Sequence, residues 1–482
     1  FLRGLSIDGV YKYLLERLDL LVPTLKELKE NRTFRIDSTF YDKQANEYDL
    51  LIRSKAHYFI PEEQVVSGPF GSSLTSDAYR TSGVPFIRIE DIKGGYTINQ
   101  DEMIYISEED NSRLKSSQML EDDIILSKVG NSIGFYARVD EKIGHCNISE
   151  NNIGIKLGDM PRERKHFILV YLNSKYGKLL TNRRRSGNAQ PKLNVFDVAE
   201  IPIPAMSADF ETMISKLVLE AYFLEKQSED KQKAAMDLLL NTLGIDSWKP
   251  VEKNTSVRSL KDITKRGRID AEYYADKYDE LLEKLSTFDC RELGAIVTTH
   301  KSIEPGSDAY QEAGIPFYRV ANITESGLCE TNTFLEEARY YTDELGLKKD
   351  RILFSKDGSI GIAYKIRKDE KAITSGALLH LEVEAKDILP DYLAVVLNSL
   401  IVKMQAERDA GGSVIQHWKP DEIEKVTIPV VDGAVQEEIA SLMREGFTLK
   451  DRSEELLKKA KAAVECSIGE GEAEAVRRCL GE

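Results

Sequence analysis

The sequence lacks the cysteine and histidine patterns on which disulfide frameworks and metal sites depend. Its cysteines are odd in number and none forms a Cys-x-x-Cys pair; they are Cys146, Cys290, Cys329, Cys466 and Cys479. The six histidines are equally scattered along the chain. We therefore expect free thiols, and neither a disulfide framework nor a zinc site.

Long apolar runs are also missing. No stretch approaches the roughly 18 consecutive apolar residues of a membrane span, and no charged start followed by an apolar stretch suggests a secretory signal. We expect a cytoplasmic protein without a membrane partner.

Catalytic signatures are absent as well. The chain has no Gly-x-x-x-x-Gly-Lys-Ser/Thr phosphate loop, no Gly-x-Ser-x-Gly elbow and no His-Glu-x-x-His zinc motif. None of the 14 prolines adjoins another, so the Asp/Asn-Pro-Pro-aromatic motif with which amino-methyltransferases hold a flipped base is missing. These absences favour a binding protein over a catalyst.

The charge balance has no excess of basic residues. Lysine and arginine number 66 against 81 aspartates and glutamates, which gives a net charge of −15. This balance argues against a protein that binds nucleic acid through overall basicity, although a basic groove on an acidic protein remains compatible with it. The hydrophobic content of 41% is ordinary for a globular protein.

What the chain does contain is a long internal repeat. Short motifs recur in the same order with an offset of about 230 residues, so each copy is a whole domain and not a solenoid unit. The matching segments are 35–41 with 268–274, 83–92 with 314–323, 127–130 with 355–358, 172–174 with 397–399, and 201–202 with 428–429. The protein therefore acts with two similar heads.

The composition changes along the chain define five segments. Helical apolar spacing predicts a lead-in helix over 1–30, and two stretches of alternating segments with Gly, Asn, Asp and Pro punctuation predict mixed α/β heads over 31–205 and 251–431. Expected strands in the first head include 85–89 and 123–127. Long helical patterns predict spacer helices over 206–250 and 432–482.

Each long helical pattern has mostly apolar residues at alternating steps of four and three, the spacing of a coiled-coil seam. The first seam is Phe210, Ile214, Leu217, Ala221, Leu224, Ser228, Lys231, Ala235, Leu238, Thr242 and Ile245. The second is Val435, Ile439, Leu442, Gly446, Leu449, Ser453, Leu456, Ala460 and Ala463. Each helix could pack on its own head, but we favour pairing of the two helices with each other, because an apolar stripe must be buried.

Three places in each head could meet a polyanion: the turn after the Gly-x-Pro-Phe strand, the Ser-Lys-x-Gly segment, and an amide-rich and cation-rich loop. In the first head the candidate residues are Arg88, Lys128, Asn131, Arg183, Arg184, Arg185, Asn188, Gln190 and Lys192. In the second they are Arg319, Lys356, Ser359, Arg408, Ser413, Gln416, His417 and Lys419. Framework residues and the helical seam recur, whereas the stretches 93–120 and 324–348 show little similarity, as expected for two readers of different sequences.

Taken together and in order, these motifs resemble the specificity subunit of a type I restriction-modification system. The resemblance implies two similar target recognition domains, separated by two long helices that form an antiparallel coiled coil with pseudo-twofold repeat. It also implies that each domain reads one half of a split site in double-stranded DNA, and that the helices dock two adenine methyltransferase subunits. S-adenosylmethionine would be bound by those partners and not by this chain, and a motor and endonuclease subunit would add translocation and cleavage.

Two alternatives remain open from the sequence. The segment could be the specificity region of a fused single-chain restriction-methylation enzyme. It could also be a two-headed interaction scaffold that does not bind DNA, which the low isoelectric point of about 5.2 favours. A scaffold predicts no salt-dependent DNA affinity, whereas DNA readers lose affinity steeply as salt rises.

Overall fold

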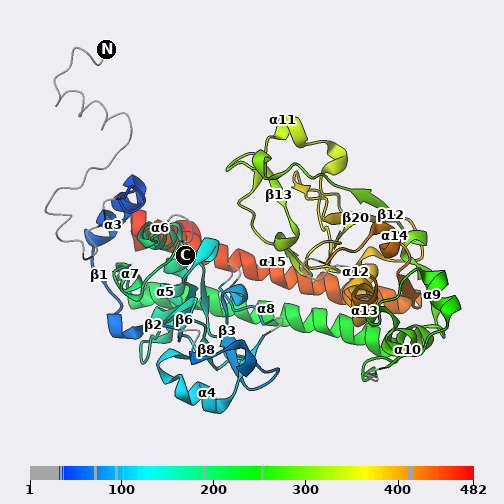
Figure 1. Cartoon of the computed structure of the whole chain (residues 1–482). Coiled ribbons are helices and arrows are strands. Elements are labelled where there is room, and N and C mark those ends of the chain that lie inside the picture. Colours follow the sequence, from blue (N-terminus) through cyan, green and yellow to red (C-terminus); the bar gives the residue numbers. More distant parts are fainter. Residues whose placement is uncertain are drawn as a thin grey trace, which may run out of the picture. The chain divides into compact units, whose positions relative to one another are not determined.

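The computed structural model forms two compact units, residues 1–223 with 452–482 (unit 1) and residues 224–451 (unit 2) (Figure 1). It describes residues 32, 35, 37–69, 73–92, 96–100, 103–187, 191–250, 255–410 and 416–481. The predicted lead-in helix over 1–30 lies outside the described residues. Both units mix helices with sheets, which confirms the predicted mixed α/β class.

Unit 1 contains a central antiparallel sheet in the order β2-β9-β6-β7. These strands are β2 (Val65–Ser67), β9 (Asn152–Ile155), β6 (Ile124–Ser127) and β7 (Tyr136–Arg138). All four residues of β6 are buried, as its continuous apolar run requires of a central strand. The predicted strand over 123–127 is thereby confirmed.

A second sheet in unit 1 has the order β4-β3-β8-β5, with β3 and β8 parallel. Its strands are β4 (Tyr105–Ile106), β3 (Val84–Ile87), β8 (His145–Ile148) and β5 (Gln118–Leu120). The strand predicted over 85–89 corresponds to β3 and ends two residues early, because Arg88 caps a 3-10 turn, η5 (Ile89–Asp91). A short pair, β1 (His57–Tyr58) with β10 (Ile203–Pro204), completes the strands described in this unit.

Among the described helices of unit 1, α5 (Arg162–Asn173) and α7 (Val195–Ala199) pack against the central sheet. The other short helices that the structure describes in this unit are α3 (Lys43–Arg53), α4 (Glu108–Arg113), α6 (Lys175–Arg184) and α16 (Glu472–Ala475), followed by the π-helical turn η13 (Val476–Leu480). Gly177 lies in the first turn of α6, which begins directly after α5, and a Cβ atom there would lie 2.4 Å from the Tyr171 carbonyl oxygen. Glycine therefore permits the tight turn between these two helices.

Unit 2 repeats this plan. Its antiparallel sheet β12-β20-β17-β18 consists of Val297–Lys301, Leu378–Val383, Ile352–Ser355 and Ala363–Lys365. The sheet β16-β13-β19 consists of Phe334–Leu335, Ile315–Tyr318 and Ile373–Thr374, and its β13–β19 pair is parallel, like β3–β8 of unit 1.

The remaining strands of unit 2 form two antiparallel pairs, β11 (Asp289–Glu292) with β21 (Thr427–Val430) and β14 (Ile323–Thr324) with β15 (Gly327–Leu328). Its helices are α9 (Leu260–Arg266), α10 (Asp276–Leu285), α11 (Glu337–Tyr340), α12 (Pro390–Asn398), α13 (Leu400–Asp409) and α14 (Pro420–Ile423).

Two long helices, α8 (Ala208–Thr242) and α15 (Gly433–Glu470), contribute residues to both units. Within unit 1, the core includes Phe210, Ile214 and Val218 of α8 together with Ala460, Val464 and Ile468 of α15. Within unit 2, it includes Ala235 and Leu239 of α8 together with Ile439 and Met443 of α15. In each unit, therefore, the head and both helices share one hydrophobic core.

None of the helices that the structure describes combines the length and the apolar character that crossing a membrane requires.

Candidate nucleic-acid interface

The Ser-Lys-x-Gly segment of unit 1 leaves β6 and runs beside residues 191–193. The Gly130 amide donates to the Pro191 carbonyl oxygen over 3.1 Å, and the Leu193 amide donates to that of Lys128 over 2.9 Å. Gly130 has a φ of +77°, a left-handed conformation that favours glycine. Two segments about 60 residues apart in sequence thus form one small hydrogen-bonded structure.

Unit 2 builds the same structure from residues 356–358 and 416–418. The Gly358 amide donates to the Gln416 carbonyl oxygen over 3.0 Å, and the Trp418 amide donates to that of Lys356 over 2.8 Å. Gly358 has a φ of +73°. We call each pair of segments, 128–130 with 191–193 and 356–358 with 416–418, a loop frame.

Each loop frame is anchored by one buried side chain. Leu193 is buried in the core of unit 1, and Trp418 of unit 2 is 1% exposed with its ring 5.7 Å from that of Phe354. The anchors hold the frames against the central sheets, so that the neighbouring side chains have defined positions.

The repeated Arg-x-Asp motif holds the helix that leads into each loop. The Arg35 guanidinium donates to the carbonyl oxygens of Arg184 and Arg185, each over 2.9 Å, while it pairs with Asp37. In unit 2, Arg268 donates to the Asp409 carbonyl oxygen over 2.9 Å and pairs with Asp270. Carbonyl groups at the ends of α6 and α13 are thereby capped.

These ion pairs also set the protonation of the two aspartates. The hydrogen bond from Arg35 lowers the pKa of Asp37, and the hydrogen bond from Arg268 lowers the pKa of Asp270. Both aspartates are therefore held in their ionised form.

An aromatic ring between two arginines completes each cap. The Phe40 ring lies 4.9 Å from the Arg35 guanidinium and 4.7 Å from that of Arg183. The Tyr273 ring lies 4.4 Å from the guanidinium of Arg268 and 5.6 Å from that of Arg408. Cation–π contacts of this kind stabilise a buried guanidinium, and they give Arg183 and Arg408 structural roles.

Two of the predicted DNA-contacting arginines in unit 1 are buried. Burial, with the neighbouring Arg184 cation, lowers the pKa of Arg183 to about 10. Arg184 is 4% exposed and donates to the carbonyl oxygens of Leu180 and Glu200. Only Arg185, beyond the end of α6, is exposed in this arginine run.

The cations around the unit 1 frame are Lys128, Arg185 and Lys192. Lys128 donates to the Ser67 hydroxyl over 2.9 Å, and its pKa is lowered mainly by burial, with a contribution from Lys192. Arg185 and Lys192 are exposed. A depression of about 660 Å³ lies beside the frame and is lined by Arg35, Asp37, Thr39, Arg184, Arg185, Ser186, Gly187, Pro191, Asn194 and Asp197. This face suits an anionic backbone.

The unit 2 frame carries a carboxylate among its polar groups. Asp357 pairs with Lys356 and lies 2.8 Å from Nδ1 of His417. Gln416 and Ser359 are exposed. Lys419 is also exposed, and it lies 3.3 Å from Glu422. The two frames thus share a backbone and differ in electrostatics.

The remaining described candidates lie on the 3-10 turns that follow β3 and β13. Arg88 pairs with Glu90 at 2.7 Å and with Asp91 at 3.4 Å. Arg319 caps η11 (Val320–Asn322) and lies 5.7 Å from the Tyr310 ring. Asn188, Gln190, Ser413 and the side chain of Asn131 lie outside the described residues.

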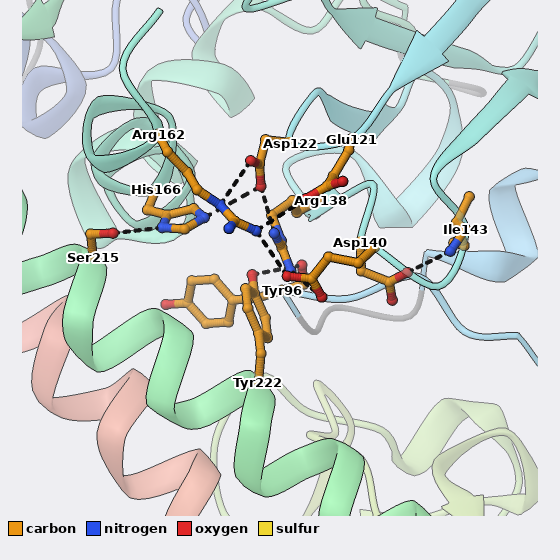
Figure 2. A network of polar contacts seen from close by, with 11 residues as sticks. Tyr96, Glu121, Asp122, Arg138, Asp140, Ile143, Arg162, His166, Ser215 and Tyr222 are labelled. Atoms are coloured by element: carbon orange, nitrogen blue, oxygen red, sulfur yellow. Dashed lines mark hydrogen bonds and ion pairs between the residues drawn. The ribbon is translucent and has the colours of Figure 1, made fainter.

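A buried polar network that the sequence did not suggest joins the head of unit 1 to α8. Figure 2 shows Asp122 facing Arg138, Arg162 and His166, and His166 also reaching Ser215. Asp122 lies 2.5 Å from Arg138 and 3.0 Å from Arg162, and His166 Nδ1 lies 2.8 Å from the Ser215 hydroxyl. These residues are far apart in sequence and belong to no short motif, so no signal in one sequence identifies them.

The aspartate, histidine and serine are connected in the order of a hydrolytic triad, but they are buried. Asp122, His166 and Ser215 are 7%, 0% and 4% exposed, so a substrate cannot reach the hydroxyl. Burial lowers the pKa of His166, which keeps the imidazole neutral. Burial alone would raise the pKa of Asp122, but hydrogen bonds from His166 and Arg138 outweigh it and lower that pKa. The network is a structural link between head and helix.

Unit 2 retains part of this arrangement. Lys365 lies 3.4 Å from Asp350 and 2.8 Å from Asp391. Asp350 and Lys365 occupy the positions of Asp122 and Arg138, whereas Asp391 in the first turn of α12 takes the place of Arg162 in the first turn of α5. The contact with the long helix is made by Arg367, which pairs with Asp451 of α15. The Arg367 guanidinium lies 4.9 Å from the Phe447 ring on α15, as Arg138 lies 4.2 Å from the Tyr222 ring on α8. Each head is thus attached to a helix by its own polar and cation–π contacts.

Among solved structures, the S subunit of a type I restriction-modification system from M. genitalium is 13% identical over 86% of this chain and 94% of that chain, with a TM-score of 0.37. The HsdS subunit from Thermoanaerobacter tengcongensis is 12% identical over 86% of this chain and 97% of that chain, with a TM-score of 0.28. No curated protein matches the chain.

A family model matches the second half of the sequence. Residues 285–464 match the model described as the type I restriction modification DNA specificity domain. This range contains the unit 2 loop frame, its sheets and most of α15. The family description names DNA specificity and not a catalytic activity. The resemblance predicted from the repeated motifs is confirmed over residues 285–464, which match the type I restriction modification DNA specificity domain.

Proposed function

We propose that this chain is the DNA specificity subunit of a type I restriction-modification system, without catalysis of its own. Each head recognises one part of a bipartite double-stranded DNA target. The observation that carries the proposal is the loop frame, built twice on one backbone plan with different side chains. Two similar scaffolds with different exposed groups are what two readers of different half-sites require.

We assign the heads to residues 31–205 and 251–431. In the first head, Arg185 and Lys192 are exposed beside the frame and hold the DNA backbone, with Lys128 at the edge of this surface. In the second, Ser359, Gln416, His417 and Lys419 face the target. Arg88, Arg319, Lys356, Asn131, Asn188, Gln190 and Ser413 remain proposed contacts from the sequence. We do not carry Arg183, Arg184 and Arg408 forward, because the first two are buried and the half-buried Arg408 is paired with Asp409 and packed on Tyr273.

We assign residues 206–250 and 432–482 to a spacer in which α8 and α15 pair antiparallel. In unit 1, Ser207 at the start of α8 donates to Glu472, just beyond the end of α15. In unit 2, Lys231 pairs with Glu445 at 2.6 Å. Both contacts suit helices that run in opposite directions. A helix of about 35 residues spans roughly 50 Å, which would set a fixed distance between half-sites.

The exposed faces of these helices are the proposed docking sites of two adenine methyltransferase subunits, which would bind S-adenosylmethionine. Phe223, near the middle of α8, is 61% exposed. An exposed large aromatic side chain on a helix is more typical of a protein interface than of a solvated face.

The net charge of −15 is compatible with this function because an acidic protein can still carry a local group of cations. Arg185, Lys192 and Lys128 gather at one frame of an acidic protein, so the local potential can attract a polyanion while other surfaces face protein partners.

The test is methylation mapping by single-molecule sequencing in cells that express this chain with a partner adenine methyltransferase subunit. We expect methylation at a split motif with a gap of fixed length. Methylation at no defined motif would refute the proposal and favour an interaction scaffold. The purified complex should also lose affinity for its target as salt rises, with a log–log slope that reports the number of phosphate contacts.

A further inference from the structure

The two loop frames differ most at one corner. Val129 of unit 1 bridges to Lys192, and Asp357 of unit 2 bridges to His417 in the same antiparallel manner. The backbone hydrogen bonds on either side of this corner are the same in both units. A carboxylate therefore takes the place of an apolar side chain at an otherwise equivalent position.

The Asp357 carboxylate is held in a defined orientation. Its Oδ1 atom lies 2.8 Å from Nδ1 of His417, and its Oδ2 atom accepts from the Lys356 ammonium group. The buried Trp418 ring fixes the strand on which His417 lies. An ionised carboxylate accepts about four hydrogen bonds, so about two acceptor sites remain. Because the side chain is 24% exposed, an outside donor can reach them.

A carboxylate at a DNA surface has few favourable partners. It is repelled by phosphate oxygens, and in the major groove it finds donors at the exocyclic amino groups of cytosine and adenine. Lys356 contacts one carboxylate oxygen and His417 the other, so each oxygen keeps an acceptor site for a further donor. In unit 1 the same corner presents Val129 between the cations Lys128 and Lys192, which suits a phosphate or a thymine methyl group.

We infer that Asp357 determines base specificity in the second head, by accepting a hydrogen bond from the exocyclic amino group of a cytosine or adenine in its half-site. His417 is a positioning residue that orients this carboxylate. The inference rests on the proposed function and goes further, because it names the residue and the chemical group that it reads.

The test replaces Asp357 with the residue that the first head carries at this corner. Asp357→Val removes both acceptors, and the Val129 frame shows that this backbone accommodates valine. Asp289→Asn serves as a control, because this carboxylate is 62% exposed on β11 and lies outside the frame. Methylation motifs are mapped for the wild type and both variants in complex with the methyltransferase subunits.

We expect the wild type and Asp289→Asn to give the same bipartite motif. Asp357→Val should lose preference at one base pair of one half-site by about 10-fold to 100-fold, the range for one direct base contact. A bipartite wild-type motif that Asp357→Val leaves unchanged at every position would overturn the inference and leave the proposed function intact. A wild type without a motif would overturn both.

A second measurement leaves the wild-type protein unaltered. The purified complex is titrated with target duplexes in which the cytosine or adenine of the affected pair lacks its exocyclic amino group, and with duplexes that carry the same analogue in the unread gap. Wild-type affinity should fall about 10-fold or more for the first duplex only. The Asp357→Val complex should bind both equally. A wild-type complex that ignores the missing amino group would refute the readout by Asp357.

Discussion

The contact between the long helices in unit 2 can be tested at Gly446. A Cβ atom at this position would lie 3.2 Å from both Cγ of Gln232 and the carbonyl oxygen of Ser228, and 3.4 Å from Cβ of Lys231. Gly469 lies on the same helix, where the nearest atom to a Cβ would be the Tyr176 hydroxyl oxygen at 3.5 Å. One glycine therefore faces a neighbouring helix at close range, and the other has ordinary clearance.

The expected free-energy changes follow from these distances. Replacing a helical glycine by alanine favours the helix by up to about 1 kcal/mol, and by less near a helix end. Gly469→Ala should therefore be neutral or stabilise by a few tenths of a kcal/mol. Compared with Gly469→Ala, Gly446→Ala should lower the free energy of unfolding by about 1 kcal/mol, because the Ser228 carbonyl belongs to a helix backbone and cannot move away without distorting the helix. Gly446→Leu forces further atoms into the contact and should destabilise by about 2 kcal/mol.

The assay is thermal unfolding of the full chain, monitored by calorimetry. A loss of about 2 kcal/mol in a unit of this size lowers Tm by roughly 4 to 8 °C. We expect this shift for Gly446→Leu, and no decrease for Gly469→Ala. If Gly446→Leu melted with the wild type, the close contact between residues 228–232 and 446 would be refuted, and the antiparallel spacer would lose its main support in unit 2.

Three further predictions concern pH, salt and the buried network. Burial lowers the pKa of His380 to about 4, against about 6.5 in the unfolded chain. As pH falls, the unfolded state therefore binds the proton before the folded state does. The free energy of unfolding should decrease by roughly 3 kcal/mol between pH 6.5 and pH 4. His380→Asn should flatten that part of the stability profile, and an unchanged slope would contradict the assignment. Combining Arg185→Ala with Lys192→Ala should reduce the salt slope of DNA binding by about 2, whereas an unchanged slope would exclude both as phosphate contacts. Asp122→Asn removes the close, buried charge partner of Arg138 and leaves only Glu141 at 4.0 Å, so it should cost about 3 kcal/mol in denaturant unfolding. A cost below 1 kcal/mol would show that the network is dispensable.

Local patterns predicted the regular elements well. The strand predicted over 123–127 is β6, whose three consecutive apolar residues are all buried, because a central strand covered on both faces needs no alternation. The strand over 85–89 stops early at β3, because the Arg88 backbone amide donates to the side chain of Asp91 three residues later. Spacing in the long helices also identified buried positions such as Ile214 and Ala235.

The sequence could not show which charged residues are used internally. Arg183 and Arg184 belong to a cation-rich run that is typical of a solvated or DNA-binding face, yet both are buried. Their partners are the Phe40 ring and the carbonyl oxygen of Glu200, which come together only when α6 packs in the folded unit. The Asp122 network was missed for the same reason, because its members meet only through tertiary packing.

The two heads share a backbone geometry and differ in the side chains that it carries. Arg35 and Arg268 cap equivalent helix ends, and Gly130 and Gly358 adopt the same left-handed turn, so these residues maintain the scaffold. Asp357 stands on that scaffold in one head and Val129 in the other, with unchanged backbone hydrogen bonds around them. A side-chain difference that leaves the backbone unchanged alters the surface of the head, and therefore what that surface binds. Under the proposed function, the corner of the loop frame is the place where two copies of one domain differ in what they read.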